Sequence, residues 1–498
     1  MVWRKNVVSV VLWGIYVVFV LMECVGGGIW IINRLGYKNQ YLFLVVVAVL
    51  VLTAFLLSLL IQFLVKKWPE LTLSKMTRLV LESLLIVFLL AAGIALRVLN
   101  LAGAAEEASY YEAAMIAEGN ILPQVVHGAT YLYLQLLHGI FRIFGNRWIA
   151  GIWLQILLQM TACLCLYFGV RKMSGSIPAI IMMAFLLLLP ERVMEGVTYS
   201  PKMLYLLLYS IGLLGVGIFI EKYSDSEKQR IRDYVYIVLL GLLLGFLGYL
   251  DINGFSLIPA AFSVWYVRKS GNGSRLPVGE SLILLIGIIM GFLGSILGDA
   301  ILSGKTVSGI LGAWLSQYSS PDFSFAYLGN ESGEYIIYLL ICLLMMIGVF
   351  GYWNRKGYEK ITPWVLLLAG CVVLKYFRVT ADGMETGVIL YWICTVLAGI
   401  AVAECCCRKP VLADIMDIVE PAPLAEPPEA VFLNQLPESG EIEDTPKPTE
   451  PSKSMRFIEN PLPLPKKHVK KVMIFELEIA ENQMHYDLDV ADDDDFDI

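Results

Sequence analysis

Long apolar runs, separated by short polar connections, fill the chain as far as residue 404. An α-helix needs about 20 consecutive apolar residues to cross the hydrocarbon core of a bilayer. On this criterion the candidate spans are residues 7–32, 41–65, 79–99, 146–170, 177–192, 201–220, 234–250, 253–267, 281–301, 335–353, 362–380 and 386–404. The pattern predicts an all-α, polytopic membrane protein with about twelve transmembrane helices.

Composition agrees with this class. Hydrophobic residues make up 58% of the chain, charged residues 16%, and the mean hydropathy is +0.69. Soluble domains contain about 45–50% apolar and about 25% charged residues. The first run, 7–32, is too long for a removable signal peptide and lacks a small-residue cleavage site, so we expect it to stay as the first helix.

Basic residues gather in alternate connections between the spans. They are Arg4, Lys5, Lys66, Lys67, Lys75, Arg78, Arg171, Lys172, Lys222, Lys228, Arg230, Arg232, Arg268, Lys269, Arg275, Arg355, Lys356, Lys360, Arg408 and Lys409. Because cytoplasmic loops carry an excess of Lys and Arg, these connections and both termini are predicted to be cytoplasmic. The chain is then a multi-pass protein of the cell membrane, and its segment 100–145 lies outside.

That topology requires residues 130–144 not to cross the membrane. The stretch is only about 15 residues long, shorter than a spanning helix, and Arg142 and Arg147 flank its end. We expect a helix lying in the outer membrane interface.

The outer segment also carries the densest polar chemistry of the chain. On a helix, Glu106 and Tyr110 share one face, and Glu107 and Tyr111 share the neighbouring one. His127 follows in the same segment. These side chains, beside a membrane edge, are the candidate active-site residues.

The order of these features resembles the GT-C superfamily of glycosyltransferases. It begins with Arg97 at the end of an apolar helix, continues through EEASYY and HGATYLYLQLLHGIFRIFG, and extends to about Tyr266 through LLPERVMEGVTYSPKMLYLLLYSIGL. In that superfamily the first outer loop carries a catalytic carboxylate, usually Asp. Here Glu106 and Glu107 stand at that position, and HGA replaces a histidine followed by prolines.

The resemblance implies transfer of a sugar from a polyprenyl-phosphate or dolichyl-phosphate donor to an acceptor hydroxyl on the outer face, with inversion. Glu106 or Glu107 would be the catalytic base. Tyr110, Tyr111 and His127 would bind substrate. The transfer needs no cofactor, and nothing in the sequence supports a divalent metal. The expected partners are membrane lipid, the lipid-linked sugar, an unidentified glycan, lipid or protein acceptor, and no nucleic acid.

Four cations lie near predicted outer helix ends, where they are unusual. Arg97 closes the third span, and Lys202 begins the sixth. Both are predicted to bind substrate, and Arg97 is a candidate, with Lys375 and Arg378, for binding the leaving lipid phosphate. Lys375 and Arg378, three residues apart, share a helix face on which two cations could hold a lipid phosphate. The alternative is that each side chain reaches the outer headgroups without a further role.

Other function classes lose support from absent motifs. The sequence contains no Walker A loop, no dinucleotide-binding glycine turn, no His/Cys metal spacing and no Gly-x-Ser-x-Gly elbow. Two alternatives remain. One is a non-catalytic GT-C-like protein in lipid-linked glycan flipping or polymer assembly, favoured by Glu in place of Asp. The other is a transporter.

Composition changes sharply after the last span. Residues 405–498 begin with three cysteines and become rich in Pro, Asp and Glu without helical periodicity, which is typical of a disordered tail. The predicted domains are two N-terminal transmembrane helices (1–78), a GT-C-like core (79–404) with an outer catalytic loop (100–145), and this cytoplasmic tail (405–498). Its basic, Pro-rich stretch is a candidate site for a cytoplasmic partner.

Overall fold

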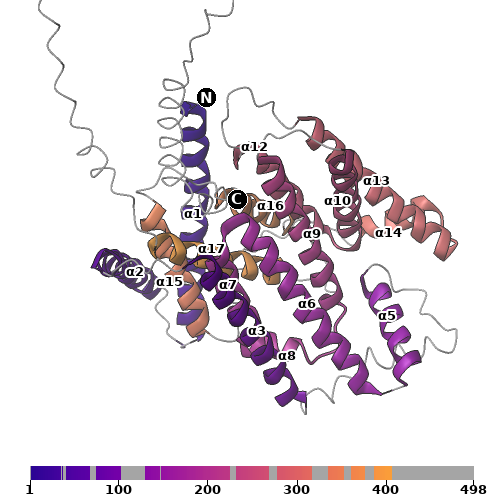
Figure 1. Cartoon of the computed structure of the whole chain (residues 1–498), viewed down its shortest axis with the longest axis horizontal. Helices are drawn as coiled ribbons and strands as arrows, with labels where there is room; N and C mark the ends of the chain where they lie inside the picture. Colours follow the sequence, from indigo (N-terminus) through magenta and orange to yellow (C-terminus); the bar gives the residue numbers. More distant parts are fainter. Residues whose placement is uncertain are drawn as a thin grey trace, which may run out of the picture. The chain divides into compact units, whose positions relative to one another are not determined.

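The computed structural model describes eleven parts of the chain (Figure 1). They are residues 2–34, 36, 41–67, 74–101, 129–145, 147–224, 231–267, 278–316, 335–352, 360–375 and 386–406. All regular elements in these parts are helices, so the all-α prediction is confirmed for them. The chain divides into two units, Met1–Cys407 and Arg408–Ile498. The predicted tail lies outside the described residues from position 407 onwards, and its disorder stays a prediction; Cys405 and Cys406 still belong to the last helix.

Within the described parts, seven helices are long and apolar enough to cross a membrane, which supports the membrane-protein prediction. They are α1 (Val2–Arg34), α2 (Leu42–Lys67), α3 (Lys75–Leu99), α6 (Trp148–Ser174), α9 (Lys202–Ser224), α10 (Ile231–Leu250) and α13 (Val278–Ser303). Shorter apolar helices are α7 (Ser176–Leu188), α14 (Val307–Ser316), α15 (Tyr335–Tyr352), α16 (Thr362–Lys375) and α17 (Thr386–Cys406). The number of twelve crossings stays a prediction.

Two expected spans are interrupted: within 177–192 the helix α7 ends at Leu188, and 253–267 is divided into short elements. Residues 253–267 are not one helix: they belong to a 3₁₀ helix, η2 (Ile252–Ser256), and two short helices, α11 (Leu257–Phe262) and α12 (Val264–Val267). Asp251 starts the segment by accepting a 2.9 Å hydrogen bond from the backbone of Asn253. The segment ends beside α13, where the Trp265 indole donates to Ser281 at 2.8 Å. The interruption is local, and the segment packs against α9 and α16.

The helix α6 lies at the centre of the core and runs parallel to α9 (Figure 1). Near their first turns, the Gln155 amide donates to the Ser200 carbonyl at 2.8 Å. Near their last turns, a Cβ on Gly169 would lie 3.2 Å from the backbone of Leu214. Along the chain, α7 follows α6 and runs antiparallel to it, so that α9 can begin at the same end as α6. As a result, the first turns of α6 and α9 and the last turns of α3 and α7 meet at one end of the core.

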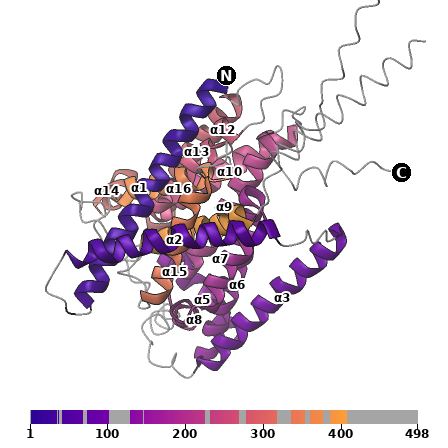
Figure 2. The same cartoon turned by 90° about the vertical axis from the view of Figure 1, so that its left-hand side faces the viewer.

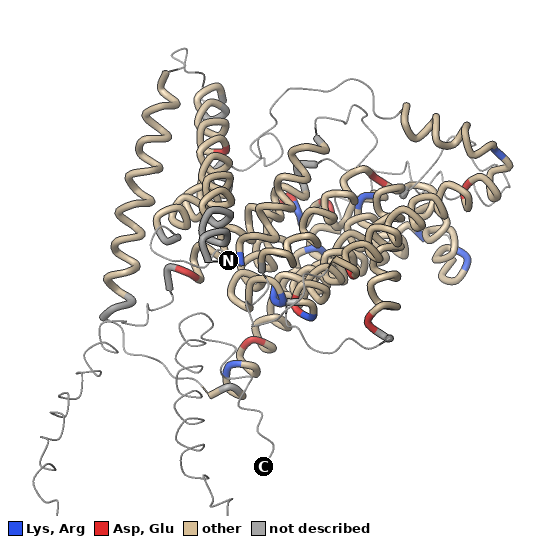
Figure 3. Tube along the Cα trace, turned by 90° about the horizontal axis from the view of Figure 1, so that it is seen from above, with Lys and Arg blue, Asp and Glu red and all other residues tan. Residues whose placement is uncertain are grey.

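The opposite end of this core carries interhelical ion pairs. Arg171 lies 3.0 Å from Glu82, Lys172 lies 2.5 Å from Glu221, Lys360 lies 3.5 Å from Glu404, and Lys222 pairs with Asp233. Charged residues are otherwise sparse along the described helices (Figure 3). Four basic residues from three predicted cytoplasmic connections are therefore each matched by a carboxylate. Which side of a membrane this end faces stays a prediction.

Two further groups of helices complete the described part. The helix α1 contacts α2 and α15, and α2 also packs against α15 and α17 (Figure 2). The Tyr16 hydroxyl joins α1 to α15 by donating to the Met345 carbonyl at 2.6 Å. On the other side, α13 packs on α10 through glycines, where a Cβ on Gly287 would lie 3.1 Å from the Gly241 Cα.

Candidate functional site

Most of the predicted site residues lie outside the described residues. These are Glu106, Glu107, Tyr110, Tyr111, His127 and Arg378. Lys375 is the last residue of α16, and its side chain is also outside them. Arg97 and Lys202 are described with their side chains. The roles predicted for all of these residues remain untested.

The described helices nevertheless restrict where the predicted catalytic loop begins and ends. The loop leaves α3 after Leu101 and rejoins the described chain at α5 (Ala129–Phe144). Glu106 follows Leu101 by five residues in the sequence. The two glutamates are thus tethered to the end of α3.

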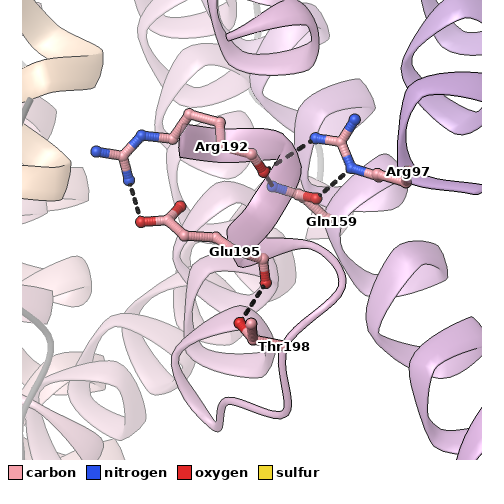
Figure 4. A network of polar contacts seen from close by, with 5 residues as sticks. All are labelled: Arg97, Gln159, Arg192, Glu195 and Thr198. Carbon is pink, nitrogen blue, oxygen red and sulfur yellow. Dashed lines mark hydrogen bonds and ion pairs between the residues drawn. The ribbon is translucent and has the colours of Figure 1, made fainter. Parts of the chain in front are cut away.

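Arg97 occupies the last turn of α3 and is completely buried. Its Nε donates to the Gln159 Oε1 at 2.6 Å, and its Nη2 donates to the Arg192 carbonyl at 3.2 Å (Figure 4). Its Nη1 donates to the carbonyls of Gly93 at 2.8 Å and Leu187 at 3.0 Å. All these acceptors are uncharged groups of the protein itself. In this arrangement Arg97 joins α3 to α6, α7 and the following short helix.

That short helix is α8 (Pro190–Glu195), and its position follows from its sequence. α7 ends before Leu189, whose extended backbone precedes Pro190. Proline is well suited to the first position of a helix because the amide proton it lacks has no partner there. The charged residues of α8 follow at once. α8 therefore places polar groups directly at the end of the apolar helix α7.

The Arg192 carbonyl is the central acceptor of this network. It accepts from Arg97 and also from the Gln159 amide nitrogen at 2.8 Å. Gly196 follows α8 in an ordinary right-handed helical conformation. A Cβ there would lie 2.0 Å from the Gln159 Oε1 and 2.6 Å from the Arg97 Nε. Only glycine fits against this network without displacing it.

The side chain of Arg192 points away from Arg97 (Figure 4). Its Nη1 lies 2.6 Å from the Glu195 carboxylate, and its guanidinium lies 5.0 Å from the centre of the Tyr391 ring on α17. Burial lowers the pKa of Arg192, but the nearby carboxylates of Glu195 and Glu191 offset this, and the net pKa is raised. Arg192 is therefore a permanent cation that holds α8 against α17.

One face of α6 packs against the connection between α8 and α9. Gly151, Gln155 and Gln159 follow one another at four-residue spacing, so they share a helix face. Gln155 is fully buried, and its Oε1 has no hydrogen-bond partner among the described residues. A buried acceptor without a partner costs about 1–3 kcal/mol. This atom is the least satisfied polar group next to the α8–α9 connection.

Lys202 opens α9 at the same end of the core. Its backbone amide donates to the Ser200 Oγ at 3.2 Å, and its side chain is partly exposed. One and two turns later on the same face, the buried Tyr205 and Tyr209 point towards η2. The Tyr209 hydroxyl lies 2.8 Å from the Ser256 Oγ. The structure thus places Lys202 beside a layer of aromatic and hydroxyl groups.

The sequence analysis did not single out Gln155, Gln159, Arg192 or Glu195. The two glutamines could have been recognised in the sequence. They are the only Asn or Gln side chains of α6, and they lie one helical turn apart in an otherwise apolar run. The signal for α8 was the charged PERVME segment at the end of a span. Among the described residues, no group of three or more His, Cys, Asp and Glu side chains is arranged to hold a metal ion.

Together, these contacts assemble a polar end of the core. It contains the buried Arg97 network, the charged Arg192, the partly exposed Glu195 and Lys202, and the point at which the predicted catalytic loop leaves α3. Cations and a carboxylate gathered at one end of a helical core suit the binding of an anionic headgroup.

Comparison with known proteins gives limited information. No family model and no curated protein matches the chain. Among solved structures, the chain is similar to the archaeal oligosaccharyltransferase AglB from Archaeoglobus fulgidus, in complex with an inhibitory peptide and a dolichol-phosphate. The TM-score is 0.38 and the sequence identity 11%, over 65% of this chain and 50% of the other. The chain therefore spans half the length of that protein, and a likeness this weak carries no functional argument.

Proposed function

We propose that this protein is a GT-C-like membrane glycosyltransferase that moves a sugar from a polyprenyl-phosphate donor to an acceptor hydroxyl. The observation that supports the proposal most is the fixed end of α3. Arg97 and Gln159 bind the Arg192 carbonyl, so α8 and the start of the loop with Glu106 and Glu107 are held at one end of the core. The sequence resemblance places the catalytic carboxylate in this same loop.

In the proposed reaction, Glu106 or Glu107 accepts the proton of the acceptor hydroxyl. The hydroxyl oxygen attacks the anomeric carbon while the bond from that carbon to the phosphate oxygen breaks. The bonding electrons leave with the lipid phosphate, and the glutamate is left protonated. A positioned general base of this kind contributes on the order of 10²–10⁴-fold to the rate.

The leaving lipid phosphate requires cations rather than an acid, because it departs as a stable anion. Lys202, Lys375 and Arg378 are the proposed cations. Arg97 was the fourth candidate, but every described hydrogen bond of its guanidinium goes to a neutral group inside the protein. We therefore assign Arg97 to holding α8 in place, and we assign phosphate binding to the other three.

The remaining parts of the proposal concern the setting of the reaction. Transfer occurs on the extracytoplasmic face and inverts the anomeric centre, in the assembly of a cell-envelope glycan. Both chain termini are cytoplasmic, and no cofactor takes part. Tyr110, Tyr111 and His127 contact the donor or the acceptor within the loop.

Substitution of the two glutamates tests the proposal. In membranes supplied with labelled polyprenyl-phosphate sugar, we expect Glu106→Gln to lower transfer on the order of 10²–10⁴-fold and Glu107→Gln to lower it less, because one carboxylate faces the acceptor. Glu118→Gln, in the same loop, is the matched control and should leave the rate unchanged. Full transfer by the Glu106→Gln, Glu107→Gln double variant would refute the enzymatic proposal.

One observation favours the alternative of a non-catalytic carrier of lipid-linked glycans or a transporter. The segment η2–α11–α12 is interrupted and carries buried Asn253, Ser256 and Ser263 beside Asp251. Interrupted helices with polar residues line substrate paths in transporters. If this alternative holds, the glutamate double variant keeps translocating substrate into the vesicle lumen, and Asn253→Leu abolishes translocation.

A further inference from the structure

The turn between α5 and α6 presents an unusual surface. We define the hairpin tip as Arg142, Ile143, Phe144, Arg147 and Trp148. The chain turns here through Gly145, whose φ of 76° lies in the left-handed region that favours glycine. Both arginines are exposed, and Ile143, Phe144 and Trp148 are 74%, 64% and 41% exposed. The tip therefore combines two cations with a bare apolar surface.

The rest of α5 is firmly packed. Tyr133, Leu137 and Phe141 recur at four-residue spacing and are almost completely buried in the core. A Cβ on Gly151 of α6 would lie 2.9 Å from a methyl group of Leu137. The exposed tip is thus the end of an ordered helix, and it is not exposed because α5 lacks contacts.

The two arginines of the tip have no acidic neighbour in sequence, because no Asp or Glu occurs between Ala129 and Pro190. In the described part of the chain, their side chains also make no ion pair or hydrogen bond. The cations at the opposite end of the core differ in this respect: Arg171, Lys172 and Lys222 each have a carboxylate partner. The positive charge of the hairpin tip is uncompensated by the described protein.

The hairpin tip belongs to the same end of the core as α8. The Tyr199 hydroxyl, in the α8–α9 connection, donates to the carbonyl of Trp148. The tip also marks the first turn of α6, which is long and apolar enough to cross a membrane. It therefore lies at the level where a spanning helix meets lipid headgroups.

We propose that the hairpin tip binds the headgroups of anionic phospholipids. Guanidinium groups bind phosphate oxygens in a bidentate manner. Aromatic residues such as Trp148 favour the boundary between headgroups and acyl chains, and the bare Ile143 and Phe144 extend the same contact. The proposal requires only that the tip meets a membrane surface, so it goes beyond the catalytic assignment and does not depend on it.

The binding has a consequence for α5 as a whole. The inner face of α5 is packed on α6 and α9, and its first residue is where the predicted catalytic loop rejoins the described chain. With its last turn bound to headgroups and its middle fixed to the core, α5 has a defined height relative to the membrane surface. The point at which the chain enters α5 is then held at that height.

Lipid binding by the purified full chain tests the inference. The protein is delipidated in a neutral detergent and titrated with fluorescent phosphatidylglycerol or phosphatidylcholine. An exposed basic residue near an anionic surface contributes about 1 kcal/mol, so Arg142→Gln with Arg147→Gln should weaken binding of phosphatidylglycerol roughly 30-fold. Binding of phosphatidylcholine should hardly change. Arg78→Gln removes an exposed arginine from the first turn of α3 and serves as the matched control.

Two further measurements keep the test decisive. Thermal unfolding confirms that the double variant is folded, and Ile143→Ser with Phe144→Ser should weaken binding of both lipids to a similar extent. Raising the salt concentration should reduce the preference for phosphatidylglycerol, because the interaction is electrostatic. Equal loss in the Arg78→Gln control, unchanged binding in the double variant, or full competition by inorganic phosphate would each overturn the proposal.

Discussion

Arg97 connects more helices than any other side chain of the polar end of the core. The acceptors of its guanidinium lie on α3, α6, α7 and α8. Four hydrogen bonds compensate a buried cation whose charge has no carboxylate directly bound to it. The stability of this end of the protein therefore depends on close contact between α8 and its neighbours.

Substitution of Gly196 tests that contact. The backbone conformation of Gly196 suits any residue, so the only obstacle to alanine is the space taken by Gln159 and Arg97. We expect Gly196→Ala to lower the free energy of unfolding by about 2 kcal/mol, as overpacking does. Gly139→Ala is the control, since a Cβ there meets nothing within 4 Å; it should be neutral or stabilising. Thermal unfolding in detergent distinguishes the two, and equal stability would contradict the network.

The sequence located Arg97 but did not reveal what it binds. An arginine near the end of an apolar run can reach headgroups, bind a ligand or enter the protein, and all three leave the same pattern. The acceptors that decide the matter are mainly backbone carbonyls of Leu187 and Arg192, which any residue supplies. Only Gln159 had a side chain whose position on an apolar helix pointed to a buried partner.

At the scale of helices, the contact of α10 with α13 depends on glycine. A Cβ on Gly291 would lie 2.3 Å from the Leu242 carbonyl, and a Cβ on Gly245 would lie 2.1 Å from the Ile288 carbonyl. The obstructing atoms belong to the backbone, which cannot move aside as a side chain does. Small residues allow membrane helices to approach this closely.

Two substitutions on α13 should therefore have opposite effects. Gly291→Ala should separate the helices and lower the free energy of unfolding by about 2 kcal/mol, despite the better helix propensity of alanine. Gly294→Ala meets nothing within 4 Å and should raise stability by up to about 1 kcal/mol. Chemical unfolding of both variants in mixed micelles is the measurement, and a loss at Gly294 as large as that at Gly291 would contradict the packing.

Hydrophobic runs predicted the places of the helices well and their continuity less well. The runs at 79–99 and 146–170 match α3 and α6, because a long uninterrupted apolar stretch has few alternatives to a helix. The run at 253–267 is less apolar and is divided at Ser256 and Ser263. Its breaks depend on polar groups such as Asp251, which caps η2, and hydropathy averaged over a window does not detect single capping residues.

At the scale of the whole molecule, the alternation of basic connections along the chain leads to a topology prediction. Cysteine placed at Asn100, exposed after the last turn of α3, should react with an impermeant reagent from outside the cell. Cysteine at Arg78, in the first turn of the same helix, should react only after permeabilisation. About 33 Å of helix separates the two positions, enough to cross the hydrocarbon core. The experiment requires Cys405, Cys406 and Cys407 to be replaced by serine, and labelling of both positions from one side would reject a crossing at α3.

A second prediction at this scale concerns the unit Arg408–Ile498. Its composition lacks periodic apolar residues that would form a core, so a chain ended after Lys409 should insert, stay folded in detergent and keep its transfer rate. Co-purification should show whether a cytoplasmic partner is lost on truncation. A truncated chain that is well folded but inactive would mean that the tail contributes to the reaction.

The contacts of Arg97 also have a consequence for how the protein is made. Its acceptors outside α3 lie 62 to 95 residues further along the chain, so they do not yet exist when α3 leaves the ribosome. Until α6, α7 and α8 follow, the guanidinium must stay hydrated at the membrane surface. We expect a nascent chain stopped before Leu187 to leave Arg97 open to modification by phenylglyoxal, whereas the finished protein shields it. Dehydration of one arginine would then mark the moment at which this half of the core closes.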